Sequence, residues 1–405
     1  MTNTALLVLS GLLVLAYLLD VLGRRIRLPS VVLLIATGLV GRQLLDHLGL
    51  RLNFVDEVLP LVGTIGLILI VLEATLDLEL RRDRRRLIAM SSAVALLGFL
   101  ATLLAFTLML YLALGYEPQV AALAAMPFAV ISSAVAIPSA HGLAAAPREF
   151  VTYESALSDI IGILVFYAWL AADGSLAVFG EGLFGGGLLS LLAAALAALL
   201  LFFLINRVEG HVRFVPLLAG LMLLYAVGKV LHLSPLVLVL VCGLLLNNPH
   251  LIERTRYLRR MHGKGYDRTF AEFKGLVAEL TFATKSVFFI MLGYWTDMHD
   301  MLDWRAWAVA AVMFATIYAS RAMILGLLEI GHVRQLLWIA PRGLITVLLF
   351  LGAMETGRLE GFPFGAVMLV VMSTAVATAL AHRDDPADGP AARAPADQSR
   401  SKPAS

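Results

Sequence analysis

Long apolar runs occupy most of the chain, and their length restricts the fold more than any other feature of the sequence. A bilayer has a hydrocarbon core about 30 Å thick, so one helix needs roughly 20 apolar residues to cross it. We find about thirteen such runs, each bounded by charges or by glycine and proline. They cover approximately residues 4–22, 29–45, 58–78, 87–114, 119–140, 150–172, 185–206, 213–231, 234–248, 272–294, 304–328, 333–354 and 362–382. The sequence therefore predicts an all-α polytopic membrane protein with about 13 transmembrane helices.

Composition excludes several other classes of protein. Hydrophobic residues make up 60% of the 405 residues and charged residues 15%, against about 25% charged residues in an average soluble domain. Cys242 is the single cysteine, so no intramolecular disulfide can form. The nine histidines form no paired metal motif, and a net charge of +2 is too small to indicate nucleic-acid binding. We expect no cofactor, no nucleic-acid partner and no enzymatic activity.

Lysine and arginine are distributed unevenly between alternate loops, and loops rich in them stay on the cytoplasmic side of a membrane. The rich set includes the cluster at 81–86 and six basic residues within 254–268, whereas the poor set holds only Arg42, Arg51, Lys229 and Arg358. We therefore predict a multi-pass protein of the cell membrane with its N-terminus outside and its C-terminus in the cytoplasm. A membrane domain of residues 1–382 is expected to precede a disordered cytoplasmic tail at 383–405, which is rich in Asp, Pro, Ala and Ser.

Five charged residues fall at bilayer depth, where a charge needs a partner or a water-filled cavity. They are Glu154, Asp159, Lys285, Arg321 and Arg342. At a rise of about 1.5 Å per residue, Asp159 lies about 15 Å into its run and Glu154 about 6 Å. Arg321 reaches the depth of Glu154 from the opposite direction, so we expect these two to form a buried ion pair. Asp159 has no assigned partner, and the role of Lys285 stays open between pairing with a carboxylate and a misplaced span.

A polar stripe follows one face of the sixth run. Residues 154–159 read Glu-Ser-Ala-Leu-Ser-Asp, and residues four apart share a helix face. Glu154 is therefore stacked with Ser158, and Ser155 with Asp159. Hydroxyl and carboxylate oxygens are hard ligands that suit a dehydrated Na⁺ or K⁺ at Asp159. The alternative is that the stripe only joins helices through hydrogen bonds.

Two runs contain residues that interrupt helices. Residues 131–138 read Ile-Ser-Ser-Ala-Val-Ala-Ile-Pro, and residues 339–343 read Ile-Ala-Pro-Arg-Gly. A shift of seven helices relates the two runs, and because seven is odd the second copy crosses the membrane in the opposite direction. Paired interruptions in oppositely oriented halves indicate an inverted-repeat transporter with a site at the midplane. We expect repeat halves of about 1–172 and 213–382, with two broken helices that cross.

These residues resemble the sodium/proton exchanger family of the monovalent cation:proton antiporters. Residues 154–159 are similar to the family's Glu-Ser-x-x-Asn-Asp, and residues 338–343 to its Trp-x-x-x-Arg-Gly. The resemblance implies that Asp159 binds the cation and the proton alternately. It also implies that Glu154 is a structural glutamate paired with Arg321.

The same resemblance assigns roles to three further residues. Glu73 stands where many members carry a Phe-Glu-x-Gly-Leu pattern and would lend an oxygen at the cytoplasmic approach. Ser155 matches a serine that contributes a ligand in some members, and Arg342 would offset the dipoles of helix ends. In the family a core bundle moves against a dimerisation domain, which implies a homodimer here.

Two departures from the family pattern leave the cation open. Ser158 replaces the usual Asn, and Ser132-Ser133-Ala134 replaces the Thr-Asp-Pro of typical sodium exchangers. The latter is closer to the Ser-Ser-Thr of the potassium-efflux branch, whose nucleotide-binding regulatory domain is not expected here. Ser132 and Ser133 join the candidate ligands.

The predicted function is exchange of a monovalent cation, Na⁺ before K⁺, for a proton by alternating access. We expect Asp159 at the end of an aqueous funnel, where either substrate neutralises one carboxylate, and hence electroneutral one-for-one exchange. The alternatives are a K⁺/H⁺ antiporter of the potassium-efflux branch and a sodium-coupled solute symporter of related design. A channel and an intramembrane enzyme are disfavoured, because no filter loop, zinc motif or second aspartate at that depth is present. The GxGxxG pattern at 180–185 follows no strand, so it does not indicate a dinucleotide site.

Overall fold

A computed structural model describes residues 2–26, 28–49, 55–80, 82–172, 175–181, 187–207, 214–231, 233, 235–252, 266–359 and 361–381. Within these ranges all regular secondary structure is helical, which confirms the all-α prediction. The tail expected at 383–405 lies outside the described residues, as does most of the pattern at 180–185.

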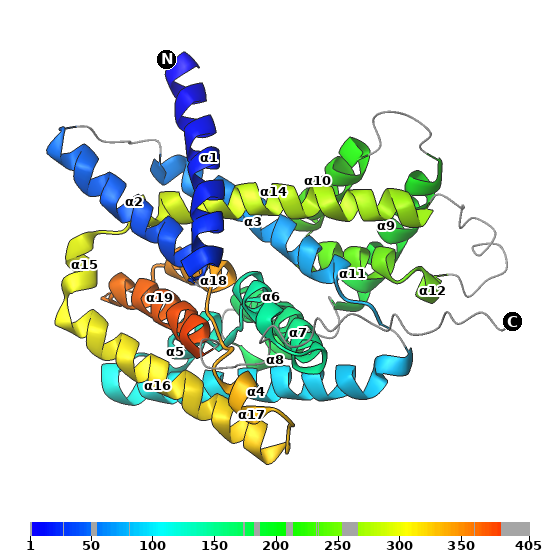
Figure 1. Ribbon diagram of the computed structural model, residues 1–405. Coiled ribbons are helices and arrows are strands. Elements are labelled where there is room, and N and C mark those ends of the chain that lie inside the picture. Colours follow the sequence, from blue (N-terminus) through cyan, green and yellow to red (C-terminus); the bar gives the residue numbers. More distant parts are fainter. Residues whose placement is uncertain are drawn as a thin grey trace, which may run out of the picture.

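The first part of the chain forms the helices coloured blue to cyan-green in Figure 1. These are α1 (Thr2–Ile26), α2 (Ser30–His47), α3 (Val55–Leu76), the 3-10 turn η1 (Arg82–Arg84), α4 (Arg85–Leu114), α5 (Pro118–Ala129), α6 (Ser133–Ser139), the 3-10 turn η2 (Ala140–Gly142), α7 (Ala145–Ala171) and α8 (Leu176–Glu181). The remaining helices are α9 (Gly187–Arg207), α10 (Phe214–Val230), α11 (Pro235–Asn247), α12 (Pro249–Ile252), α14 (Tyr266–Trp295), α15 (Met298–Leu302), α16 (Trp304–Leu327), α17 (Val333–Leu337), α18 (Leu344–Met354) and α19 (Phe364–Ala381).

Over the described residues, each apolar run coincides with one long helix or with a broken pair of helices. The main difference lies at two helix starts, because α7 begins at Ala145 and α14 at Tyr266, each more than a turn before its run. Those extra turns carry Arg148, Glu149 and Arg268. Apolar content marks the part of a helix that lipid or protein surrounds, whereas the backbone hydrogen bonds continue beyond it. Glu154 therefore lies deeper in its helix than the run predicts.

Length and composition allow several of these helices to cross a membrane. Among the described residues, six segments are long and apolar enough for this, namely α3, α4, the α5 and α6 pair, α7, α14 and α16. Shorter apolar helices occur in α9, α10, α11, α18 and α19.

The helices form two groups, which Figure 1 shows above and below the centre of the view. In the panel group, α14 packs along α2 and α3, α11 packs on α3, and α9 and α10 pack on α11. In the crossing group, α4, α7 and α16 surround the broken pairs α5 with α6 and α17 with α18, and α19 packs on α16. The groups meet where α7 and α18 contact α3 and where α19 contacts α2.

Small residues set the closest approach within the panel group. A Cβ atom on Gly38 of α2 would lie 2.1 Å from the Ile290 carbonyl oxygen, and one on Gly293 of α14 would lie 2.2 Å from the Ile35 carbonyl oxygen. Neither position has room for a side chain. The two glycines let the helix backbones touch. Helices in a membrane usually pack tightly in this way, because the hydrophobic effect does not drive them together within lipid.

Asn248 joins the ends of α3 and α11. Its side chain is buried, with 1% of its surface exposed. The Oδ1 atom accepts a hydrogen bond from the Leu80 N–H at 2.6 Å, and Nδ2 donates to the carbonyls of Leu78 and Leu244, both at 2.8 Å. One amide therefore satisfies three backbone groups that the helix ends leave unpaired.

We predict that Asn248→Leu lowers the free energy of unfolding by at least about 2 kcal/mol, because buried backbone groups lose their partners at about 1–3 kcal/mol each. Denaturation in mixed detergent micelles measures the change. Asn247→Leu is the matched control, since the Asn247 Nδ2 atom has no hydrogen-bond partner. Equal effects of the two substitutions would contradict this role.

Candidate functional site

Two helix breaks lie against each other inside the crossing group. The first spans residues 130–132, between α5 and α6, and the second spans residues 338–343, between α17 and α18. The Ser132 N–H donates to the Pro341 carbonyl at 3.0 Å, so the two unwound segments are in direct contact. Both helices that the sequence predicts to be broken are therefore interrupted, and their breaks are in contact.

The local sequence explains both breaks. In the first, Pro127 cannot donate a hydrogen bond within α5, and the β-branched pair Val130 and Ile131 follows. In the second, Pro341 disfavours helical backbone at Ala340. Gly343 permits the close contact, because a Cβ atom there would lie 2.5 Å from the Ser132 Oγ atom.

Asp159 points from the middle of α7 at the first break. Its carboxylate oxygen Oδ2 accepts a hydrogen bond from the Ser133 N–H at 3.0 Å, and the Ser133 hydroxyl lies close to the same carboxylate. The other oxygen, Oδ1, is buried and has no hydrogen-bond partner. The residue is 2% exposed, so in this conformation the funnel that the sequence predicts is closed at the carboxylate.

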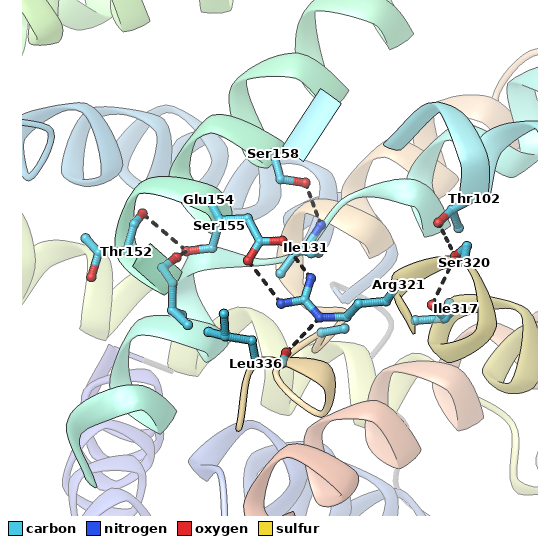
Figure 2. Close-up of polar contacts among 12 residues, drawn as sticks. Thr102, Ile131, Thr152, Glu154, Ser155, Ser158, Ile317, Ser320, Arg321 and Leu336 are labelled. Atoms are coloured by element: carbon cyan, nitrogen blue, oxygen red, sulfur yellow. Dashed lines mark hydrogen bonds and ion pairs between the residues drawn. The ribbon is translucent and has the colours of Figure 1, made fainter. Parts of the chain in front are cut away.

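The candidate serines differ in how their hydroxyl groups are used. Ser132 Oγ is buried and, like Asp159 Oδ1, has no partner. Ser158 Oγ accepts from the Ile131 N–H at 2.9 Å, which Figure 2 shows, so it serves the backbone of the break. Ser155 Oγ donates to the Val151 carbonyl at 2.7 Å, one turn earlier in α7, and keeps its acceptor capacity.

Glu154 and Arg321 form a two-point ion pair, which Figure 2 shows between α7 and α16. The guanidinium donates to the two carboxylate oxygens at 2.6 and 3.0 Å, and both side chains are at most 5% exposed. The Arg321 Nε atom also donates to the Leu336 carbonyl at 2.8 Å, in the last turn of α17. The pair thus ties α7, α16 and α17 together, next to the second break.

Arg342 lies inside the second break and is 2% exposed. Its Nε atom donates to the Phe128 carbonyl at 2.6 Å, which belongs to the last turn of α5, and its Nη1 atom donates to Ala340 at 3.3 Å. It forms no ion pair among the described residues. Its positive charge therefore lies against carbonyl groups that the ends of the broken helices leave exposed.

Glu73 and Lys285 lie outside the crossing, on α3 and α14 of the panel group, and both are half-buried. Beside Glu73, Ala74 packs in one buried cluster with Ala156 of α7, so this turn of α3 lies near the boundary between the two groups. The described contacts of Asp159 do not include Glu73.

The sequence did not predict two hydroxyl groups that hydrogen-bond residues of the crossing group. Thr374 of α19 accepts the Arg342 N–H at 3.0 Å, and Thr102 of α4 hydrogen-bonds Ser320 beside Arg321 at 2.8 Å. The spacing of Thr374 and Thr378, four residues apart in an apolar run, is the signal that could have found the first. Thr102 has no polar residue three or four positions away in its run, so it carries no such signal.

A small cavity of about 20 Å³ opens beside the ion pair, lined among others by Glu154, Ser158, Arg321 and Arg342. One water molecule needs roughly 10–15 Å³ of such space. The cavity therefore has room for about one water molecule beside the buried charges.

Known proteins resemble this chain over nearly its whole length. The family model described as sodium/hydrogen exchanger, transmembrane, matches residues 10–382. A structure of the sodium proton antiporter MjNhaP1 from Methanocaldococcus jannaschii at pH 8 has a TM-score of 0.73 at 20% identity, over 94% of this chain and 97% of that one. An electron-microscopy map of the same antiporter has a TM-score of 0.70 at 20% identity, over 94% and 96%. No curated protein matches the sequence. At this identity the solved structures show a shared fold.

We predict that Glu154→Gln lowers the free energy of unfolding by about 3–5 kcal/mol, because it leaves the buried Arg321 charge without its partner. Replacing both members, Glu154→Leu with Arg321→Met, should be milder than the single substitution. Glu149→Gln is the control, since Glu149 pairs with Arg84 and both side chains are more than a third exposed. Such exposed pairs contribute at most about 1 kcal/mol. A double variant as unstable as the single one would contradict the ion-pair account.

Proposed function

Because this chain belongs to the transmembrane sodium/hydrogen exchanger family, we propose that it exchanges one monovalent cation, Na⁺ before K⁺, for one proton by alternating access. The family consists of transporters and not of enzymes, and the chain is a multi-pass membrane protein. Cation identity, stoichiometry and the residues that bind the ion are parts of the proposal.

One observation carries the proposed site. Buried polar atoms almost always have hydrogen-bond partners, yet two oxygens at the crossing, Asp159 Oδ1 and Ser132 Oγ, have none. An unpaired carboxylate oxygen and a hydroxyl oxygen are ligands suited to a dehydrated alkali cation. We propose that the ion binds between them, with Ser133, Ser155 and Ser158 completing or supporting the ligand set.

A single carboxylate explains the exchange. A proton on Asp159 removes the charge that attracts the cation, and a bound cation opposes protonation, so the two substrates compete for one site. The Glu154–Arg321 pair is neutral, and Arg342 carries the same charge in both loaded states. Either loaded form then differs from the empty one by one positive charge, which favours electroneutral one-for-one exchange.

The contacts also suggest how access alternates. Asp159 is enclosed here, while its helix and both broken helices belong to the crossing group, which meets the panel group along α3 and α2. We propose that the crossing group moves against the panel group, so that water reaches the carboxylate from one side at a time. Only such a movement lets the enclosed site exchange ions with both solutions.

Several further features belong to the same proposal. The membrane domain covers residues 1–382, with repeat halves of about 1–172 and 213–382, the N-terminus outside and the C-terminus in the cytoplasm. The protein acts as a homodimer in the cell membrane. Glu73 lends an oxygen at the cytoplasmic approach.

A K⁺/H⁺ antiporter is the second candidate, and one observation favours it. The first break carries consecutive serines, Ser132 and Ser133, where a carboxylate would strengthen Na⁺ binding. A sodium-coupled symporter is distinguished from both by uptake of an organic solute. Proton flux measured across Li⁺, Na⁺, K⁺ and Rb⁺ salts separates these possibilities.

We predict that Asp159→Asn abolishes cation-driven proton flux in reconstituted vesicles, because the amide neither accepts a proton nor neutralises a cation. Asp77→Asn is the control, since Asp77 is exposed at the end of α3 and should leave the site intact. Full flux in the Asp159 variant would rule out the proposed site.

We predict that Gly343→Ala raises the KM for the cation, because the added Cβ atom must displace the Ser132 side chain 2.5 Å away. Gly326→Ala, at a position in α16 with no atom within 4 Å of the added Cβ, should leave KM unchanged. Proton flux as a function of cation concentration measures both. An unaltered KM in the first variant would show that Ser132 does not help to bind the ion.

A further inference from the structure

Lys285 is a charged residue at bilayer depth for which exchange at Asp159 needs no role. It lies within α14 on the segment that packs against α3, and it is half-buried. A lysine in such a place is costly unless it has a partner or a function. Among the described residues no carboxylate lies within ion-pair distance of it.

The register between α3 and α14 places Lys285 relative to Glu73. The Thr281 hydroxyl of α14 reaches the Leu69 carbonyl of α3 at 3.4 Å, and a Cβ atom on Gly66 would lie 3.4 Å from the Thr284 Cγ2 atom. Residue numbers thus rise along one helix as they fall along the other, so the helices are antiparallel. Glu73 lies one turn after Leu69 in α3, and Lys285 lies one turn after Thr281 in α14. Because the helices are antiparallel, the two residues lie on opposite sides of the contact between Leu69 and Thr281.

Side-chain direction brings the two charged groups toward each other. A helical side chain leans toward the N-terminus of its own helix, so in an antiparallel pair Glu73 leans toward Leu69 and Lys285 toward Thr281. Their Cα atoms are offset by about two turns, or roughly 11 Å along the axis. An extended lysine and a glutamate can span that offset. The Lys285 ammonium and the Thr281 hydroxyl both lie near the Glu73 carboxylate.

The other lysine near Glu73, Lys274, is already paired, so Lys285 is the cation that can move toward this carboxylate. Asp77, one turn after Glu73, is paired with Lys274 of α14 at 3.2 Å. The Lys285 ammonium lies 5.8 Å from the centre of the Phe282 ring, a weak contact that a rotamer change can exchange for Glu73. Glu73 therefore has one nearby ammonium that is close but not bonded.

We propose that Lys285 is a tethered competitor for Glu73, an internal cation that pairs with this carboxylate when no metal ion is present and withdraws when one arrives. The inference rests on the proposed function, in which Glu73 offers an oxygen to the incoming cation. Each cation that binds must displace the ammonium. Lys285 thereby sets the KM for the cation without taking part in the exchange at Asp159.

The test is Lys285→Met, which removes the charge and keeps the length, with Lys285→Arg as the matched control. We expect the KM for Na⁺ or K⁺ at fixed pH to fall roughly two- to tenfold in the Met variant, because attraction within a partly solvated ion pair is modest. The maximal rate should stay near wild type, and the Arg variant should keep a wild-type KM. A structural role alone would lower the maximal rate instead.

A double-mutant cycle with Glu73→Gln completes the experiment. In that background Lys285→Met should no longer change KM, because the competitor has lost its target. An unchanged or raised KM in Lys285→Met, or the same fall in both backgrounds, would overturn the inference. Wild-type flux and its loss in Asp159→Asn are measured in the same vesicles. Failure there counts against the proposed function, whereas failure of the cycle alone counts only against the role of Lys285.

Discussion

Interrupting a helix inside a membrane exposes backbone N–H and C=O groups that water cannot reach, and the crossing of two such interruptions governs the site. Each break supplies partners to the other, as in the bond from Ser132 N–H to the Pro341 carbonyl. The rest come from side chains, since Ser158 accepts from one backbone N–H and Asp159 from that of Ser133. The carboxylate is thereby held by one oxygen while the other stays unpaired, which combines rigid placement with vacant coordination capacity.

The charged groups around the crossing have two different roles. Some hold the geometry of the breaks, and one carboxylate is proposed to bind the ion. Glu154 and Arg321 neutralise each other and connect α7 to α16 and α17, so they can hold the geometry without competing for the transported ion. Arg342 satisfies carbonyl groups at the end of α5. These groups already have partners, whereas Asp159 keeps an unpaired oxygen at the crossing, and the proposed exchange changes the charge of that carboxylate. Glu73 and Lys285 lie on α3 and α14 of the panel group, outside the described contacts of the crossing.

Much of this arrangement was predictable from the sequence. Apolar runs located the long helices, because the bilayer imposes their length, and Pro341 with Gly343 located the second break. The first break lies at the start of the predicted segment 131–138, but Pro138 itself lies inside α6. The Glu154 and Arg321 contact follows from opposite charges at one depth. The partners of Asp159 could not be predicted, since backbone N–H groups carry no residue signature. The antiparallel register that directs Lys285 toward Glu73, and the start of α7 before its apolar run, depend on packing between distant segments and are equally invisible in one sequence.

The central claim is that one enclosed carboxylate binds either a proton or a cation. Proton release on cation binding tests it most directly, using purified protein in a weakly buffered detergent solution and a pH-sensitive dye. Adding Na⁺ or K⁺ to the wild-type protein at a pH where Asp159 is protonated should release close to one proton for each cation bound, and Asp159→Asn should release none. Cation binding without proton release in the wild-type protein, or equal release in both proteins, would contradict the account.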